Sequence, residues 1–233
     1  MSVASDVAFE VVDLATSSVR ELNARLHALA HQDGPRHWRV VKPGGRHSIA
    51  AGLDAPVEVV VEGHVGYYCA GMNQQATVRV RGNCGVGLAE NIMSGTVWVE
   101  GNASQAAAAT GHGGLVVIEG DASSRCGISM KGVDIVVHGS VGHMSAFMAQ
   151  KGCLVVCGDA GDALGDSIYE AHLYVRGRVG ELGSDCVEKE MREEHVTELR
   201  GLLERGRVAD ADPSQFRRYG SARQLYNFKV DHA

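Results

Sequence analysis

One spacing constrains this 233-residue chain more than any other feature: glycine recurs every 19 residues along its middle. A fixed period of about 20 residues is typical of solenoids, in which each repeat forms one coil and packs against its neighbours. The series runs without an insertion or deletion through Gly63, Gly82, Gly101, Gly120, Gly139, Gly158 and Gly177. Such a chain is first of all a scaffold, so any chemistry has to be argued from particular side chains.

The positions around each glycine repeat in kind as well as in spacing. Small or aliphatic residues stand four and two residues before it and two residues after it in all seven coils. Side chains alternate between the two faces of a strand, so these positions and the glycine are expected to share one inward face. The residues immediately before and after the glycine are mostly polar and are expected to face outward. Among them Glu62, Arg81 and Glu100 alternate in charge, as neighbours in a stacked sheet should.

Two further columns are small: the third residue after each glycine is Gly or Ser, and the seventh is Ala, Gly or Ser. Glycine permits positive φ, so each coil is expected to contain short strands joined by tight glycine corners. We therefore predict an all-β fold, a single-stranded parallel β-helix of about seven coils, right-handed because parallel crossovers favour that hand. At about 4.8 Å per coil its length is about 34 Å. A Gly-rich antiparallel barrel is the alternative, but the coil region lacks the Asn-Gly and Asp-Gly turns of hairpins.

Composition bounds the class of protein. Aromatic residues make up 5% of the chain, and there are 30 glycines, which suits a narrow interior. The net charge of −6 and the lack of a basic stripe argue against nucleic acid. No apolar run approaches 18 residues and no signal peptide opens the chain, so we expect no membrane contact and a cytoplasmic location. The six cysteines follow the repeat rather than a metal-binding pattern, and we expect reduced structural thiols.

Both ends depart from the repeat. Ser18 and Glu21 form a capping-box pattern before an apolar stripe, which predicts a helix over roughly 18–31. A second amphipathic helix is expected over roughly 187–205, and Pro213 begins a short final helix. The resulting division is an N-terminal helical arm (1–36), a β-helix domain (37–186) and a C-terminal helical and aromatic tail (187–233).

A search for catalytic patterns returns little. No phosphate loop, zinc motif, nucleophile elbow or dinucleotide fingerprint follows a suitable strand. His112 and His143 stand in loops where they could exchange a proton, and Asp159, Asp162 and Asp166 could meet at one corner. Loop histidines and turn carboxylates are ordinary in an acidic protein. We therefore assign no catalytic, cofactor-binding or metal-binding residue and expect no cofactor in this chain.

The corner loops are less ordinary, because several are rich in methionine and aromatic residues. They occupy equivalent sections of different coils and would line up along one side. An aligned apolar ridge suits a permanent interface, although some of these side chains could instead point inward. Aromatic residues near the C-terminus could cap the coil, cover its open strand edge or contact a neighbouring subunit. The candidate partner-interface residues are Tyr67, Tyr68, Met72, Met144, Phe147, Met148, Tyr169, Tyr219 and Tyr226.

Several strings within the coils resemble a known family. They include Tyr-Tyr-Cys-Ala-Gly-Met-Asn at 67–73, Ala-Glu-Asn-Ile-Met-Ser-Gly at 89–95, Cys-Gly-Ile-Ser-Met-Lys-Gly at 126–132 and Gly-Asp-Ser-Ile-Tyr-Glu at 165–170. These strings resemble the GXGXG β-helix domain that ends the large subunit of glutamate synthase. As a free-standing chain, the sequence is similar over its whole length to the GlxC-type proteins, the β-helix subunits of N-methylglutamate synthases.

The resemblance implies a non-catalytic subunit of a larger enzyme, methylamine–glutamate N-methyltransferase. It would bridge a glutamine-amidotransferase-like subunit and a synthase-like subunit that carries FMN and iron–sulfur clusters. Two alternatives remain open. The chain could serve as the β-helix subunit of another complex, either an ammonia-dependent glutamate-synthase-like enzyme or a formylmethanofuran dehydrogenase. It could also be an independent β-helix enzyme, although hexapeptide coils repeat at 18 residues and lyases normally carry a secretion signal.

Overall fold

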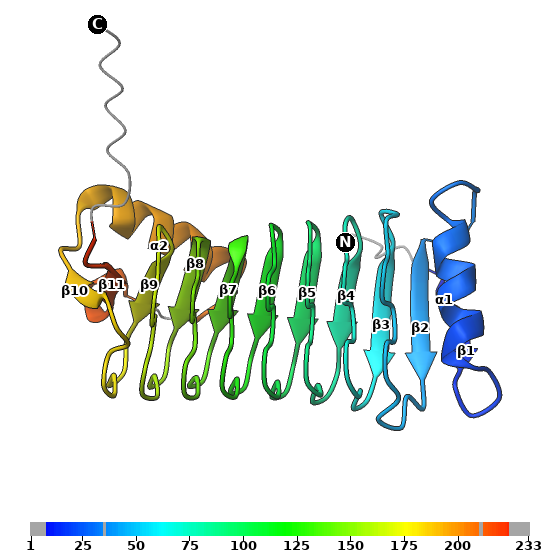
Figure 1. The fold of residues 1–233 in the computed structure, drawn as a ribbon. Coiled ribbons are helices and arrows are strands. Elements are labelled where there is room, and N and C mark those ends of the chain that lie inside the picture. Colours follow the sequence, from blue (N-terminus) through cyan, green and yellow to red (C-terminus); the bar gives the residue numbers. More distant parts are fainter. Residues whose placement is uncertain (1–7, 35, 210–211, 224–233) are drawn as a thin grey trace, which may run out of the picture.

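A row of short parallel strands runs the length of the molecule and forms a β-solenoid (Figure 1). The computed structural model describes residues 8–34, 36–209 and 212–223. The parallel strands are β1 (Glu10–Asp13), β2 (His37–Val41), β3 (Glu58–Glu62), β4 (Thr77–Val80), β5 (Thr96–Val99), β6 (Leu115–Ile118), β7 (Lys131–Val137), β8 (Lys151–Val156) and β9 (His172–Val175).

The 19-residue period is the stacking register itself. Val61 pairs with Val80, and Val80 pairs with Val99. A second row of single parallel bridges joins the residues two positions after each glycine, from Val65 to Val179. The predicted β-helix of about seven coils is therefore confirmed.

The predicted inward columns form the core. The residues four and two positions before each glycine, such as Val97 and Val99, are fully buried in all seven coils. The residues two positions after the glycine are also buried or, in the last coil, packed against the core. The periodic glycines themselves are only partly buried, so they lie at a corner rather than on the inward face as predicted.

A polar ladder explains why that corner needs glycine. The side-chain oxygen of Asn102 accepts a hydrogen bond from the backbone N–H of Asp121 at 2.8 Å, and the Asp121 side chain accepts from Ser140 N at 2.7 Å. The same contact recurs at every step from His64 to Arg178. From Asn83 onward, each of these side chains lies where a Cβ on the next periodic glycine would stand. The periodic position must therefore be glycine, because the polar side chain of the preceding coil occupies the space that a Cβ would need.

The corners are built differently from the prediction. Among the seven periodic glycines only Gly63 has a φ in the left-handed region. After each of the first six periodic glycines, left-handed residues instead stand five, seven and nine positions later, and most carry a side chain, as in Ala106, Ala108 and Thr110. Sequence reasoning failed here because it expected glycine wherever φ is positive. Repeated hydrogen bonds between coils hold these residues in place, including Ala108 N to Leu88 O at 2.7 Å.

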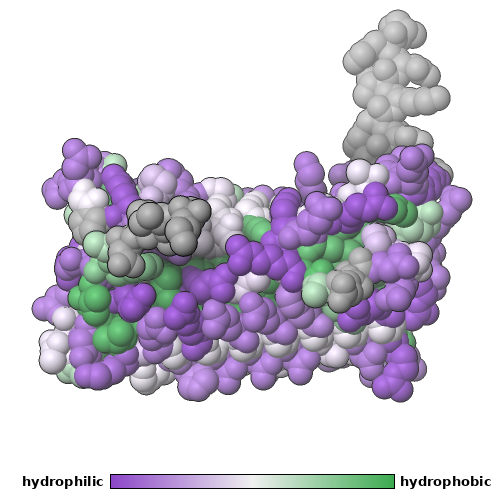
Figure 2. All heavy atoms as spheres, turned by 180° about the vertical axis from the view of Figure 1, so that it is seen from behind, coloured by the Kyte–Doolittle hydropathy of each residue, from purple (hydrophilic) through white to green (hydrophobic). Residues whose placement is uncertain are grey.

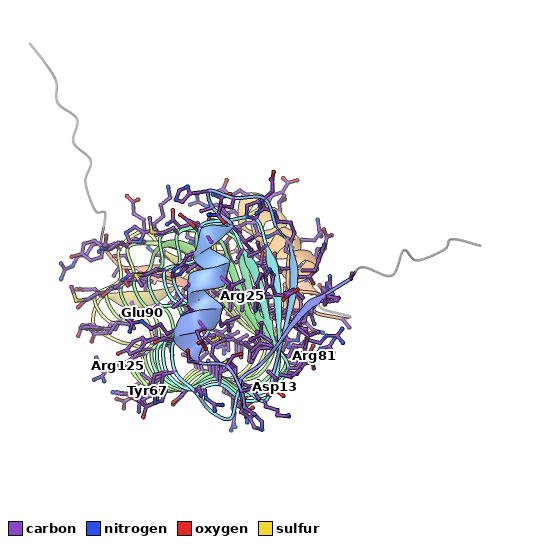
Figure 3. The ribbon with its side chains drawn as sticks, turned by 90° about the vertical axis from the view of Figure 1, so that its right-hand side faces the viewer. Asp13, Arg25, Tyr67, Arg81, Glu90 and Arg125 are labelled. Atoms are coloured by element: carbon purple, nitrogen blue, oxygen red, sulfur yellow. The ribbon has the colours of Figure 1, made fainter. Side chains whose placement is uncertain are left out.

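Helix α1 (Val19–Ala28) closes one end of the solenoid. Figure 3 shows this end in a view along the solenoid axis. Ser18 and Glu21 form the predicted capping box. Leu22 and Leu26 are buried in the same core cluster as the coils, which covers apolar surface that the first coil would otherwise expose. Strand β1, which pairs with β2, was not anticipated in this arm.

The C-terminal part closes the other end and corrects one prediction. Residues 187–192 are not helical: β10 (Cys186–Lys189) is a strand, and helix α2 (Glu193–Arg205) begins only after it. The reason is tertiary, since β10 pairs antiparallel with β11 (Arg217–Ser221), which in turn pairs with β9. The tail thus covers the open strand edge, one of the roles expected for it. The 3-10 helix η1 (Pro213–Gln215) confirms the predicted short final helix.

Candidate functional site

The exposed apolar residues of the corner loops form two patches rather than one ridge. Patch N comes from the first two coils and comprises Tyr67, Tyr68, Met72 and Met93, whose exposed fractions are 46% to 55%. Patch C comes from later coils and comprises Met148 and Tyr169, which are 40% and 38% exposed. At the position nine residues after the glycine, where Met72 and Met148 stand, the three coils between them carry the polar residues Asn91, Thr110 and Ser129.

The two tyrosines of patch N pack against residues of neighbouring coils. The Tyr67 ring stacks on His47 with centroids 4.6 Å apart, and His47 Nδ1 accepts a hydrogen bond from Tyr67 N at 2.8 Å. The Tyr68 ring lies over Gly87 of the next coil, where a Cβ would collide with it. In Figure 3 Tyr67 lies on the same side of the solenoid as Glu90 and Arg125, and Arg81 lies on the other side. Rigid, exposed tyrosines supply contact area at little entropic cost.

The remaining candidate interface residues differ in accessibility. Met144 and Phe147 are partly buried beside patch C. Tyr219 is 2% exposed, because β11 places its ring in the core cluster at the end of the solenoid. Tyr226 lies outside the described residues. Met93 belongs to patch N but was not among the predicted interface residues, although it stands in the string at 89–95 that carries the family resemblance.

The aspartates considered above as a cation site instead take part in hydrogen bonds between coils. Asp159, Asp162 and Asp166 each accept a hydrogen bond from a backbone N–H of the next coil, at 2.8, 3.0 and 3.2 Å. They therefore extend ladders rather than meet around a cation. His112 and His143 are exposed on corners. This geometry supports a scaffold role for the coil corners.

Helix α2 lies on the outer face of the sheet and makes a second core there. Its Leu199, Leu202 and Leu203 pack against outward residues of β5 to β9, among them Val136 and Val155. One signal could have revealed this: the column three residues before each glycine reads Trp98, Val117, Val136, Val155, Tyr174 from β5 onward. An apolar outward column predicts a covering element.

Under α2, groups from three elements meet around Glu198. Its carboxylate accepts hydrogen bonds from His172 Nδ1 at 2.7 Å and from the Tyr174 hydroxyl, and it contacts the Cys153 thiol. These contacts, led by His172, lower the pKa of Glu198 to about 2. Burial is the main cause that raises the pKa of Cys153, and the nearby carboxylates of Glu198 and Asp134 raise it further. Sequence reasoning could not find this cluster, because its members share no local motif.

Beyond the C-terminal end of α2, the outer sheet face is hollowed into an open groove of about 590 Å³. Trp98 forms part of it, with the guanidinium groups of Arg79 and Arg207 at 5.0 and 5.1 Å from its ring centroid. Arg79 pairs with Glu100 at 2.9 Å, and Arg205 pairs with Asp134 at 2.8 Å. Figure 2 shows this side of the molecule, where hydrophobic side chains are visible between hydrophilic ones.

Within the described ranges, neither helix is long and apolar enough to cross a membrane. No protein-family model matches the chain. The chain is similar to Protein GlxC of Rhizobium meliloti (strain 1021), with 61% identity over 223 residues. The matched region covers 96% of this chain and 98% of that protein.

Proposed function

This chain belongs to the GlxC family, and we propose that it is a non-catalytic structural subunit of a glutamate-synthase-like complex, namely N-methylglutamate synthase. That complex would convert methylamine and L-glutamate into N-methyl-L-glutamate and ammonia. The chain would bridge an amidotransferase-like subunit and a subunit that holds FMN and iron–sulfur clusters, and would hold neither cofactor itself.

The separation of patch N from patch C is the observation that carries the bridging role. Met72 and Met148 occupy the same position of their coils, nine residues after the glycine, and both are exposed. Four coils separate them, which is about 19 Å. Met and Tyr are enriched at interfaces, and two such patches on one rigid solenoid suit two partners held at a fixed distance. Polar positions of the coils, meanwhile, are engaged in the ladders that hold the coils together.

Reconstitution tests this function. We would co-express the full chain with the two proposed partner classes and measure N-methylglutamate formation from methylamine and glutamate. Activity is expected from the three-component complex and not from the chain alone. Turnover by the isolated chain would contradict the structural role, and a stable complex that turns over only another substrate would favour the alternative assembly.

Charge insertion tests the two patches. Met72→Glu should weaken retention of one partner and Met148→Glu retention of the other, because each places a carboxylate at the centre of an apolar contact. Val11→Glu is the matched control, since Val11 is 57% exposed on β1, the edge strand of the sheet, and belongs to neither patch. Pull-down of tagged variants with mass-spectrometric identification reads the result. Unchanged retention in both methionine variants would remove the bridging proposal.

A further inference from the structure

We propose that Cys153, His172 and Glu198 form a binding site for a divalent transition-metal ion of the zinc class. The three donor atoms already lie within 4.8 Å of one another. Thiolate, imidazole and carboxylate are the ligands that zinc takes in proteins. This inference is independent of the proposed function, since it concerns the isolated chain.

The fold brings the three ligands together from separate elements. Cys153 on β8 and His172 on β9 are direct partners in the parallel sheet, so their side chains leave the same outer face side by side. Glu198 reaches them from α2, which lies over that face. Leu199, Leu202 and Leu203 fix the helix on the sheet, so the carboxylate position is set by apolar packing as well as by its own hydrogen bonds.

The dimensions suit a small ion. Metal–ligand lengths of about 2.0 to 2.3 Å in a tetrahedral site put donor atoms about 3.3 to 3.8 Å apart. His172 Nδ1 and Glu198 Oε2 are now 2.7 Å apart and share a hydrogen. An ion in place of that hydrogen needs these two atoms to separate by less than about 1 Å. The Cys153 sulfur, which lies within 4.8 Å of both, needs to approach them by at most about 1.3 Å.

Neighbouring groups support the ligands as outer-shell partners do in metal sites. The Tyr174 hydroxyl donates to Glu198, and the His195 ring packs edge-on against His172 with centroids 5.3 Å apart. Asp134 contacts the Cys153 thiol from β7. An open groove of about 280 Å³ reaches His172 and gives an ion and a water ligand a route from solvent.

Binding of the metal ion changes no oxidation state and therefore needs no redox partner. The Cys153 thiol loses its proton to buffer as the metal–sulfur bond forms. Neutral His172 moves its N–H from Nδ1 to Nε2 and binds through Nδ1. Glu198 exchanges a hydrogen bond for a metal–oxygen bond, and Tyr174 keeps its hydrogen bond to the carboxylate.

Cobalt(II) titration of the chelator-treated full chain tests the site. We expect one Co²⁺ per chain, with a thiolate-to-cobalt charge-transfer band and the visible bands of tetrahedral cobalt, all removed by added Zn²⁺. Cys153→Ser should abolish the charge-transfer band. Cys157→Ser, which alters another buried thiol of the same face, is the matched control and should keep it.

A second pair of variants keeps the test decisive if Cys153→Ser fails to fold. His172→Gln and Glu198→Gln should each weaken Co²⁺ binding at least tenfold, and Zn²⁺ should raise the melting temperature of the parent chain but not of His172→Gln. Failure of the parent chain to develop a charge-transfer band at saturating Co²⁺ would overturn the proposal. So would a full-strength band in a folded Cys153→Ser variant. In that case the three groups serve only to anchor α2.

Discussion

Replacing Gly120 by alanine tests the physical account of the glycine period. A Cβ on Gly120 would overlap the Oδ1 atom of Asn102 and would stand 2.8 and 2.9 Å from the carbonyl oxygen and carbon of Gly101. The Asn102 side chain can rotate away, but the Gly101 backbone cannot, because its carbonyl accepts a hydrogen bond from Gly120 N at 3.0 Å. The substitution should therefore break one rung of the ladder and force two coils apart.

The magnitude follows from three contributions. Loss of the hydrogen bond between Asp121 N and Asn102 costs about 1 kcal/mol. Overpacking against a fixed backbone costs about 1 to 3 kcal/mol. The alanine restricts the unfolded chain, which offsets about 0.5 kcal/mol. The net loss in the free energy of unfolding is about 1.5 to 3.5 kcal/mol, or about 3 to 14 °C in melting temperature for a chain of this size.

Urea unfolding followed by circular dichroism measures this loss, with Gly201→Ala as the matched control. Gly201 lies in α2, where a Cβ would meet nothing within 4 Å, so alanine there should be neutral or stabilise by up to about 1 kcal/mol. A double-mutant cycle with Asn102→Ala should recover part of the Gly120→Ala loss, since the displaced oxygen is then gone. Equal stabilities for Gly120→Ala and the parent chain would refute the ladder explanation.

Other perturbations probe the core, the helix anchor and the thiols. Val99→Asp should destabilise the chain by about 4 kcal/mol or more in the same unfolding assay, because Val99 is fully buried and the carboxylate would have no partner; near-parent stability would contradict the register. Glu198 has a pKa lowered from 4.5 to about 2 in the folded chain, so its contribution is present above about pH 4.5 and is lost as pH falls toward 2. Glu198→Gln should flatten the melting temperature over that interval, and an unchanged pH profile would count against the anchor. Burial raises the pKa of Cys69 and Cys126 to about 12, and all six cysteines are buried and free. A thiol reagent at neutral pH should therefore label them only after denaturant is added, and rapid labelling of the native chain would argue against their burial.

Much of the fold could be predicted because its main contacts repeat. Residues 19 apart meet between neighbouring coils, so one pattern of Val, Gly and polar residues specifies the register at all six steps of the seven coils. Helix α1 could be predicted equally well, because its capping box is formed by residues close together in the sequence. The apolar corner residues could be predicted as exposed candidates, but their separation into patch N and patch C needed the accessibility of each side chain.

What the sequence by itself determined is the coil, its inward columns and the helix that opens the chain, since these depend on neighbours at short or constant separation. Only the tertiary structure decided where the non-repeating tail lies. His138 meets the carbonyl of Gly206, 68 residues away, and β11 inserts between β9 and β10. The meeting of Cys153, His172 and Glu198 follows from that placement, because a helix docked on a sheet brings together side chains that no spacing along the chain connects.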